Sequence, residues 1–259
     1  MLGYQWYATA GKPVVFLHGL LGSLHDWVST FAHLQNFAGI RPLAFDLPCH
    51  ATSQGLSCHS FSDFRQQLHS TLATLIDEPF WLVGYSLGGR LALDYTFHQP
   101  NPNLLGTIVE GANIGLRAEA ERHVRWQNDR AWAERFRTEP MQEVLADWYR
   151  QPVFADLTDD KRSVLIEKRQ QNDGKKIANM LEATSLAKQP DFRQQMWQNI
   201  HFLIGERDHK FRQMAEQNAL PHRLIAQAGH NAHWENPTDF ATQLIHIIEG
   251  KYNGTASLP

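Results

Sequence analysis

The sequence predicts an α/β fold in which a mostly parallel sheet is flanked by helices. Short apolar runs bounded by turn residues alternate with stretches of helical periodicity, a pattern typical of parallel sheets. Polar clusters follow the carboxyl ends of these runs, where open α/β sheets bind ligands. The length of 259 residues, of which 42% are hydrophobic, suits one such domain with an insertion.

The predicted strands are apolar runs that end at turn or polar residues, and the stretches between them are expected to be helical. In chain order these runs are Val14 to Leu17, Pro42 to Phe45, Phe80 to Val83, Thr107 to Val109, His201 to Ile204, and Arg223 to Ile225.

A change of character between about Asn113 and Gln189 predicts an insertion. Strand-like runs vanish there, and Arg, Trp, Glu and Gln follow helical spacing. We therefore expect a core made of residues 1–112 and 190–250, with a helical lid insertion at 113–189. Residues 251–259 are expected to form a polar tail.

Charge and composition narrow the classes of partner. A net charge of -3 gives no reason to expect nucleic acid or an anionic membrane. The start lacks the features of a secretory signal, and no apolar run reaches the roughly 20 residues of a membrane span. Cys49 and Cys58 are too few for a disulfide framework. We expect a cytoplasmic protein, a monomer or weak homo-oligomer, that acts on a small molecule without a cofactor.

A serine stands at the centre of the most informative motif, Gly84-Tyr85-Ser86-Leu87-Gly88. The motif directly follows a predicted strand and precedes a helical stretch. Its two glycines lack a Cβ, so backbone and helix can pass close together while the Ser86 hydroxyl is lifted above the sheet edge. Because a hydroxyl is a weak nucleophile and base until a neighbour takes its proton, the motif requires an acid and a histidine further along the chain.

The acid and base are assigned to Asp208 and His230, which follow the last two predicted strands. The order Ser86, Asp208, His230 is that of an α/β-hydrolase fold. His230 would take the serine proton, and Asp208 would orient the imidazole. Glu110 remains the alternative acid and His233 the alternative base. The two histidines lie outside a His-Glu-x-x-His pattern, so we expect no metal.

Two backbone N–H groups are the candidate donors to a developing oxyanion. One belongs to Leu87, at the start of the helix after the serine. The other belongs to Leu20, in the glycine-flanked loop from His18 to Gly22.

Arginines in helical stretches suggest an anionic substrate. Arg90 lies one helical turn after the serine. Arg125 shares a stripe with Trp132 and Phe136, and Arg169 lies on a later helical stretch. Guanidinium groups match carboxylates bidentately, so inward-facing arginines favour a substrate with several carboxylates. Taken singly, each is better explained as a surface arginine whose stem covers aromatic side chains. Three others are expected at the surface: Arg122, Arg130 and Arg135.

Several segments carry a family resemblance. They are Phe80 to Arg90, Ile108 to Gly111, Ala146 to Tyr149, Gln151 to Ala155, Met180 to Ala187, Gly205 to Asp208, and Gly229 to His233. In these segments the chain resembles the 2-succinyl-6-hydroxy-2,4-cyclohexadiene-1-carboxylate synthases of menaquinone biosynthesis. The resemblance covers nearly the whole chain, and its lid segments are more specific than the serine turn.

The resemblance implies a lyase. In that family the triad serine acts as a base on a carbon acid next to a ketone, the oxyanion hole holds the enolate, and pyruvate is expelled. The resemblance gives the triad its catalytic role and assigns Arg90, Arg125 and Arg169 to the substrate carboxylates. It places Tyr85 and Trp148 on the pocket wall, where packing roles are equally expected.

One segment departs from the family pattern. The family usually has Pro-Gly-His-Gly after the strand that ends near Asp46, and this chain has Pro48-Cys49-His50-Ala51. The loss of two glycines predicts a different local loop conformation at the floor of the pocket.

Two other functions remain open. The same triad could serve an ester or thioester hydrolase that works through acylated Ser86. A non-enzymatic binding module that retains the fold is the third possibility, and the complete triad argues against it.

Overall fold

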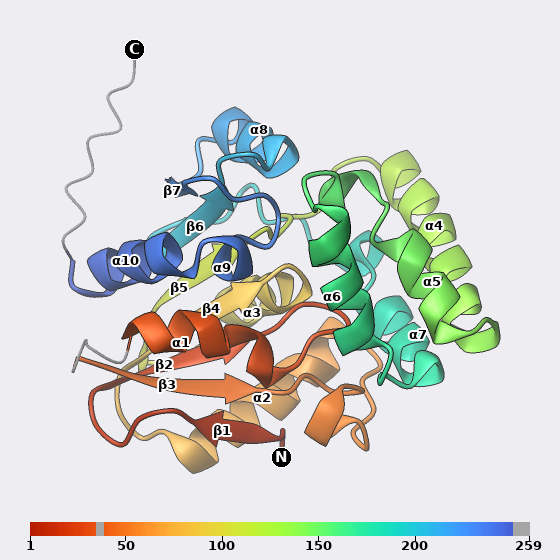
Figure 1. Cartoon of the computed structure of the whole chain (residues 1–259). Coiled ribbons are helices and arrows are strands. Elements are labelled where there is room, and N and C mark those ends of the chain that lie inside the picture. Colours follow the sequence, from red (N-terminus) through yellow and green to blue (C-terminus); the bar gives the residue numbers. More distant parts are fainter. Residues whose placement is uncertain (35–38, 251–259) are drawn as a thin grey trace.

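A computed structural model describes residues 1–34 and 39–250 of the chain. The expected tail, 251–259, lies outside the described residues. The centre of the molecule is a seven-stranded sheet with the strand order β1-β3-β2-β4-β5-β6-β7 (Figure 1). Its strands are β1 Tyr4–Trp6, β2 Lys12–Leu17, β3 Ile40–Phe45, β4 Phe80–Tyr85, β5 Leu104–Glu110, β6 Ile200–Gly205, and β7 His222–Ile225.

The predicted mostly parallel α/β sheet is confirmed. Every predicted apolar run lies within one of the strands β2 to β7, and all pairs among these strands are parallel. The sequence prediction missed β1, which pairs antiparallel with β3 at the sheet edge. Its three residues are exposed or only half-buried, so they lack the apolar run that identified the other strands.

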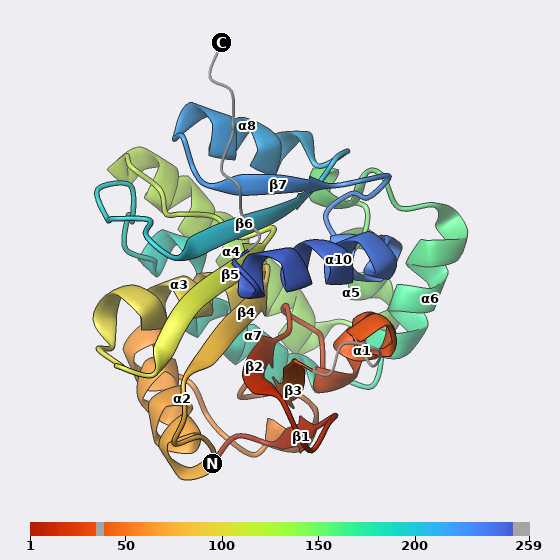
Figure 2. The same cartoon turned by 90° about the vertical axis from the view of Figure 1, so that its left-hand side faces the viewer.

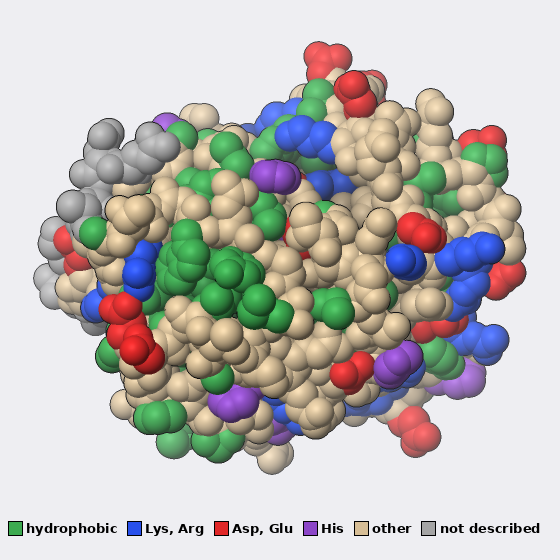
Figure 3. Space-filling model, turned by 90° about the horizontal axis from the view of Figure 1, so that it is seen from below, with side chains coloured by type: hydrophobic (Ala, Val, Ile, Leu, Met, Phe, Trp, Pro, Cys, Tyr) green, Lys and Arg blue, Asp and Glu red, His purple; other side chains and the backbone are tan. Residues whose placement is uncertain are grey.

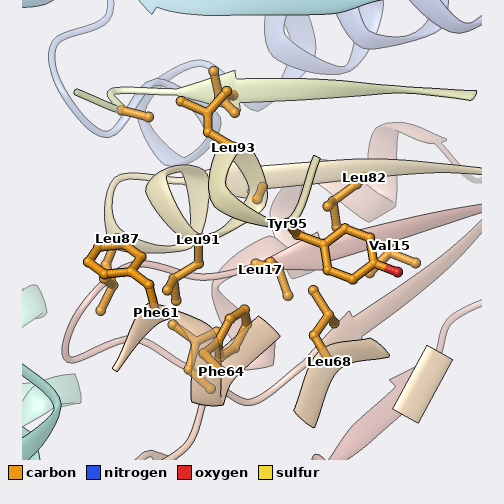
Figure 4. Packing of buried hydrophobic residues seen from close by; sticks show 14 of the residues in the cluster. Val15, Leu17, Phe61, Phe64, Leu68, Leu82, Leu87, Leu91, Leu93 and Tyr95 are labelled. Atoms are coloured by element: carbon orange, nitrogen blue, oxygen red, sulfur yellow. The ribbon is translucent and has the colours of Figure 1, made fainter. Parts of the chain in front are cut away.

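Helices cover both faces of the sheet (Figure 2). Along β2, Val15 and Leu17 pack on one face, while Val14 and Phe16 pack on the other, as the two-residue period of a strand requires. The first face is covered by α2 Phe61–Leu75, α3 Leu87–His98 and α8 His209–Gln217, and Figure 4 shows part of this packing. The second is covered by η1 Leu24–Trp27, α1 Val28–Leu34, α9 Ala232–Glu235 and α10 Pro237–Ile248. A further short helix is η2 Ala51–Ser53.

Between β5 and β6 the structure contains only helices and loops, and we refer to residues 113–189 as the lid. Its elements are α4 Glu119–Thr138, α5 Met141–Trp148, η3 Pro152–Phe154, α6 Asp159–Arg169, α7 Gly174–Ala183, and η4 Leu186–Lys188. The lid has its own hydrophobic cluster, to which residues such as Phe136, Leu145 and Ile177 belong. In Figure 1 its helices stand together beside the sheet.

The two ends of the lid meet. The Gln189 side chain donates a hydrogen bond to the Asn113 carbonyl at 2.7 Å, and the Phe192 N–H donates to the Ile114 carbonyl at 2.8 Å. The lid therefore leaves the core and returns to it at one place.

The surface seen from below carries charges of both signs. Figure 3 shows Lys and Arg side chains interspersed with Asp and Glu on this face, together with one larger hydrophobic patch. Among the described residues, no helix combines the length and apolar character needed to cross a membrane.

Candidate active site

Ser86 occupies the sharp turn that the sequence predicted. β4 ends at Tyr85, α3 begins at Leu87, and Ser86 between them has φ 51° and ψ −109°. This strained backbone depends on the two glycines. A Cβ on Gly84 would lie 2.4 Å from the Gly88 carbonyl oxygen, and one on Gly88 would lie equally close to the Leu17 and His18 carbonyls. No other residue type fits at either position.

Asp208 and His230 form the acid–histidine pair. The His230 Nδ1 atom lies 2.8 Å from Asp208 Oδ2, and each side chain is 5% exposed. Asp208 is fixed because its other oxygen caps α8 by accepting from the Phe211 N–H at 3.3 Å. If Nδ1 donates to the carboxylate, Nε2 is left as the acceptor that a general base requires. Gly111 makes room for the imidazole, since a Cβ there would lie 2.5 Å from the His230 ring.

The alternative acid and base are paired with each other. His233 Nδ1 lies 2.8 Å from Glu110 Oε2, and the His233 N–H donates to Glu110 Oε1 at 3.1 Å. Both residues are buried, and neither lines the cavity at Ser86. Across residues 1–34 and 39–250, no group of three or more His, Cys, Asp or Glu side chains could hold a metal ion.

A cavity of about 500 Å³ opens at Ser86. Of the predicted site residues, those that line it are Leu20, Ser86, Leu87, Arg90, Arg125, Trp148, Asp208 and His230. The triad, both candidate oxyanion residues and two of the three predicted arginines thus meet at one place. Trp148 contributes a wall, with its ring 5.1 Å from the Trp132 ring and 5.4 Å from that of Phe136.

The two arginines on the cavity differ in their partners. Arg90 donates to the Thr184 carbonyl at 2.8 Å, and no carboxylate within the described chain pairs with it. Burial lowers the pKa of its guanidinium to about 9, and the nearby Arg125 contributes to this shift. Arg125 donates through Nε to Asp129 at 2.8 Å. The two terminal nitrogens of its guanidinium have no hydrogen-bond partner within the described chain. Arg90 is therefore a half-buried cation whose charge an anion in the cavity would balance.

Arg169 lies elsewhere. Its guanidinium donates to both oxygens of Asp26, at 2.8 and 2.7 Å. The anion that an inward-facing arginine needs is thus supplied by the protein itself, and Arg169 does not line the cavity at Ser86.

Tyr85 also departs from its expected place. Its hydroxyl hydrogen-bonds to Asn231, and its ring lies 5.4 Å from that of His230. With Arg169 it lines a separate cavity of about 40 Å³. Tyr85 is the last residue of β4, whereas Ser86 lies in the turn after it, and only Ser86 lines the larger cavity.

Lys210 was missed by the sequence analysis. It lines the cavity beside Asp208 and His230, and it makes no hydrogen bond or ion pair with the rest of the described chain. Desolvation lowers the pKa of its ammonium, and Arg125 adds to that shift. Its position two residues after Asp208, in the first turn of α8, was the available signal.

Two buried histidines shape the loop of residues 18–22, called the oxyanion loop below. His18 Nε2 accepts from the Leu47 N–H at 3.0 Å, while its Nδ1 lies 2.7 Å from the Gly19 carbonyl. His50 Nε2 accepts from the Leu21 N–H at 3.0 Å, and its Nδ1 lies 2.8 Å from the Pro48 carbonyl. Each bond pattern needs a neutral imidazole, and burial lowers the pKa of both, that of His50 to about 3.

The loop that carries His50 keeps a backbone suited to glycine. Cys49 has φ 68° and Ala51 has φ 38°, both in the left-handed region. Both residues hold these positive φ angles at a cost in strain, because such angles favour glycine. A loop conformation different from that of the family stays a prediction.

Comparison with known proteins places the chain in a family. A profile of the alpha/beta hydrolase family matches residues 14–243. The 2-succinyl-6-hydroxy-2,4-cyclohexadiene-1-carboxylate synthase of Serratia proteamaculans is 45% identical over 243 residues, covering 92% of this chain and 94% of the relative. The enzyme of the same name from Yersinia pseudotuberculosis is also 45% identical, over 92% of this chain and 88% of its own.

Solved structures of related proteins have the same fold. MenH from S. aureus superposes with a TM-score of 0.86 at 25% identity, covering 98% of this chain and all of that one. A thermophilic esterase from Thermogutta terrifontis has a TM-score of 0.79 at 18% identity, covering 96% and 93%, and so shares the fold. The chain belongs to the alpha/beta hydrolase family and, within it, to the 2-succinyl-6-hydroxy-2,4-cyclohexadiene-1-carboxylate synthases.

Proposed function

We propose that the protein is a carbon–oxygen lyase that eliminates pyruvate from 2-succinyl-5-enolpyruvyl-6-hydroxy-3-cyclohexene-1-carboxylate. The product is 2-succinyl-6-hydroxy-2,4-cyclohexadiene-1-carboxylate. The observation that carries the proposal is the cavity at Ser86, where an acid–histidine pair and unsatisfied cations meet. The relatives of the same name support it.

The positions of the double bonds define the reaction. Ring carbon 2 carries the succinyl ketone, so its proton is acidic. Its removal leaves an enolate conjugated with the ring double bond between carbons 3 and 4. The electron pair then moves to form double bonds at carbons 2 and 4, and the carbon–oxygen bond at carbon 5 breaks. The leaving group departs as enolpyruvate, which takes up a proton on carbon to become pyruvate.

The triad supplies the base. Ser86 takes the proton from carbon 2 as it passes its own to His230, and Asp208 stabilises the resulting imidazolium. The ketone oxygen becomes the enolate oxygen, and the N–H groups of Leu20 and Leu87 are the proposed donors to it. Serine is never acylated in this sequence of steps, because no carbonyl carbon is attacked.

Cations on the cavity wall match the charges of the substrate. Its succinyl, ring and enolpyruvyl groups each carry one carboxylate. We assign the carboxylates to Arg90, Arg125 and Lys210, which line the cavity without being fully paired. A fourth cation on the wall, Arg207, is exposed and donates to the Gln227 carbonyl. A low-dielectric cavity strengthens such contacts, which charge-assisted hydrogen bonds make directional. Trp148 packs against the ring of the substrate in this arrangement.

Residues 113–189 act in this proposal as a lid that supplies Arg125 and Trp148 to a site whose chemistry lies in the core. The enzyme is proposed to work in the cytoplasm, where its two free thiols, Cys49 and Cys58, stay reduced. The monomeric or weakly oligomeric state remains a prediction.

The direct test is incubation with the proposed substrate. Pyruvate release and the absorbance of a conjugated diene should rise together, and both should be abolished in Ser86→Ala. If the wild-type protein at micromolar concentration forms no diene, the proposal is wrong. A burst of leaving group from an activated ester, lost in Ser86→Ala, would favour a hydrolase instead.

The carboxylate assignment makes a separate prediction for Arg125. Arg125→Ala should lower kcat/KM for the tri-anionic substrate about 10- to 100-fold, the loss expected for a hydrogen bond to a charged group. Turnover of a neutral ester should change far less. Equal losses on the two substrates would refute the role of Arg125 in binding a carboxylate.

A further inference from the structure

The oxyanion loop is bonded to the lid at several points. Residues of the loop and of the helix η1 that follows it face lid helix α6 and its C-terminal end. One of these contacts holds the Arg169 side chain away from the cavity at Ser86, and together they suggest a role for Arg169 other than binding substrate.

The first contact is the ion pair of Arg169 with Asp26. It is bidentate, and the two side chains are only 12% and 11% exposed. Although burial opposes ionisation, Arg169 lowers the pKa of the Asp26 carboxyl, so the pair is charged near neutrality. Asp26 Oδ2 also accepts from the Ser23 N–H at 3.2 Å, next to the end of the oxyanion loop.

The second contact reaches the loop directly. The side chain of Asn172, three residues after Arg169, donates to the Leu21 carbonyl at 2.9 Å and to the Arg169 carbonyl at 3.0 Å. Leu21 has φ 69°, and His50 accepts from its N–H. Both backbone groups of this strained residue are therefore bonded, one to the core and the other to the lid.

The third contact is hydrophobic. The Leu21 side chain is fully buried in the cluster formed by the lid residues, and Leu20 packs against the same cluster. The residue after the proposed oxyanion donor thus belongs to the hydrophobic core of the lid.

We propose that Arg169 and Asp26 are positioning residues, whose ion pair acts with the Asn172–Leu21 bond to hold the oxyanion loop in its catalytic shape when the lid is seated. This inference rests on the proposed function, because it concerns the loop that would bind the enolate. It replaces the carboxylate-binding role expected for Arg169 from the sequence.

Kinetics of Arg169→Met, Asp26→Asn and the double variant test the proposal. Loss of a positioned oxyanion donor should lower kcat about 10²-fold or more in each single variant, with KM within about threefold. The double variant should fall no further than the worse single one, because both act through one contact. A carboxylate ligand would behave otherwise, with a large rise of KM in Arg169→Met and near wild-type kinetics in Asp26→Asn. That result would overturn the proposal.

Asn172→Ala extends the test with a milder change, since it leaves the ion pair intact. It should lower kcat by about tenfold, the worth of one hydrogen bond. Lys161→Met is the matched control on α6, because it removes another lid-to-core ion pair, Lys161–Glu235 at 3.2 Å, that does not touch the oxyanion loop. Its kcat should stay within about twofold of the wild type, and a loss equal to that of Arg169→Met would overturn the assignment.

Hydrogen exchange gives a readout that needs no substrate. Peptides covering residues 18–27 should exchange faster in Arg169→Met and Asn172→Ala than in the wild type, and not in Lys161→Met. Unchanged exchange in both variants would overturn the proposal whether or not pyruvate is formed. Absence of pyruvate release by the wild type would overturn only the proposed function.

Discussion

Two acid–histidine pairs lie within one small region, and only one of them can be the catalytic pair. Asp208 and His230 line the cavity, whereas Glu110 and His233 are buried behind it. Tyr85 separates them, with its ring 5.4 Å from His230 and 4.7 Å from His233. The second pair also links two elements of the fold, because Glu110 is in β5 and His233 is in α9.

Isosteric amides at the two acids should therefore have opposite effects. Asp208→Asn should lower kcat about 10³- to 10⁴-fold, the usual cost of losing the carboxylate behind a triad histidine, with little change in stability. Glu110→Gln should leave kcat within about threefold and lower the free energy of unfolding by about 1–3 kcal/mol. Steady-state kinetics and urea unfolding measure the two effects. An exchange of these outcomes would mean that the acid is Glu110.

A second prediction at the residue scale concerns Lys210. Lys210→Met removes the charge but retains much of the side chain, so KM for the tri-anionic substrate should rise about 10- to 100-fold. Arg212→Met is the matched control on α8, because Arg212 bonds to the Glu206 carbonyl and does not line the cavity. Initial rates across substrate concentration give both constants. Equal KM values for the two variants would remove Lys210 from the binding site.

Residue identity and order were enough to predict that Ser86, Asp208 and His230 line one cavity, because the chemistry allows few residue types and the fold fixes their order along the chain. They were not enough to predict which cations face the cavity. Arg125 and Arg169 both lie on lid helices, yet only the packed structure shows that Asp26 already occupies Arg169. Because Asp26 lies 143 positions from Arg169 in the sequence, the helical periodicity around Arg169 cannot reveal this partner.

At the scale of elements, the strands were predictable wherever burial on both faces produced an apolar run. β2 to β6 have such runs. The edge strands β1 and β7 are mostly exposed or half-buried, and of these two only β7 was predicted, from the run that ends at Ile225. The loop after β3 illustrates the opposite case. Two residues that favour negative φ, Cys49 and Ala51, hold the left-handed backbone needed to present His50.

The strain at Ala51 can be measured. Ala51→Gly should raise the free energy of unfolding by about 1 kcal/mol, because the left-handed backbone costs an L-residue about that much relative to glycine. Ala131→Gly is the matched control in an exposed position of α4, and it should lower stability by about 0.5–1 kcal/mol. Urea unfolding gives both values. A destabilised Ala51→Gly variant would show that the site is not strained.

At the scale of the whole molecule, stability should depend on pH through the buried histidines. The pKa of His50 is lowered from its ordinary value to about 3 by burial and by the neighbouring His18. The unfolded chain takes up a proton as the pH falls below about 6.5, and the folded chain does not. Stability is therefore fully present above about pH 6.5 and is lost as the pH falls toward 3. At pH 5 the loss due to His50 alone is about 2 kcal/mol.

Unfolding at pH 7 and pH 5 tests this dependence. In His50→Gln the difference between the two pH values should be about 2 kcal/mol smaller than in the wild type. His59→Gln, at an exposed site, is the matched control and should keep the wild-type difference. If His50→Gln kept the full difference too, another group would be responsible.

The joined ends of the lid have a consequence for how this fold diversifies. The Gln189–Asn113 and Phe192–Ile114 bonds join the two ends of the insertion, so the backbone leaves the core and returns to it at one place, while side chains of the lid bond to the core at further points. A segment of different length could be grafted between the same two positions while the strands, the serine turn and the histidine stay in place. In such an architecture substrate choice can evolve by exchange of one contiguous piece of chain, and the proton-transfer machinery is inherited unchanged.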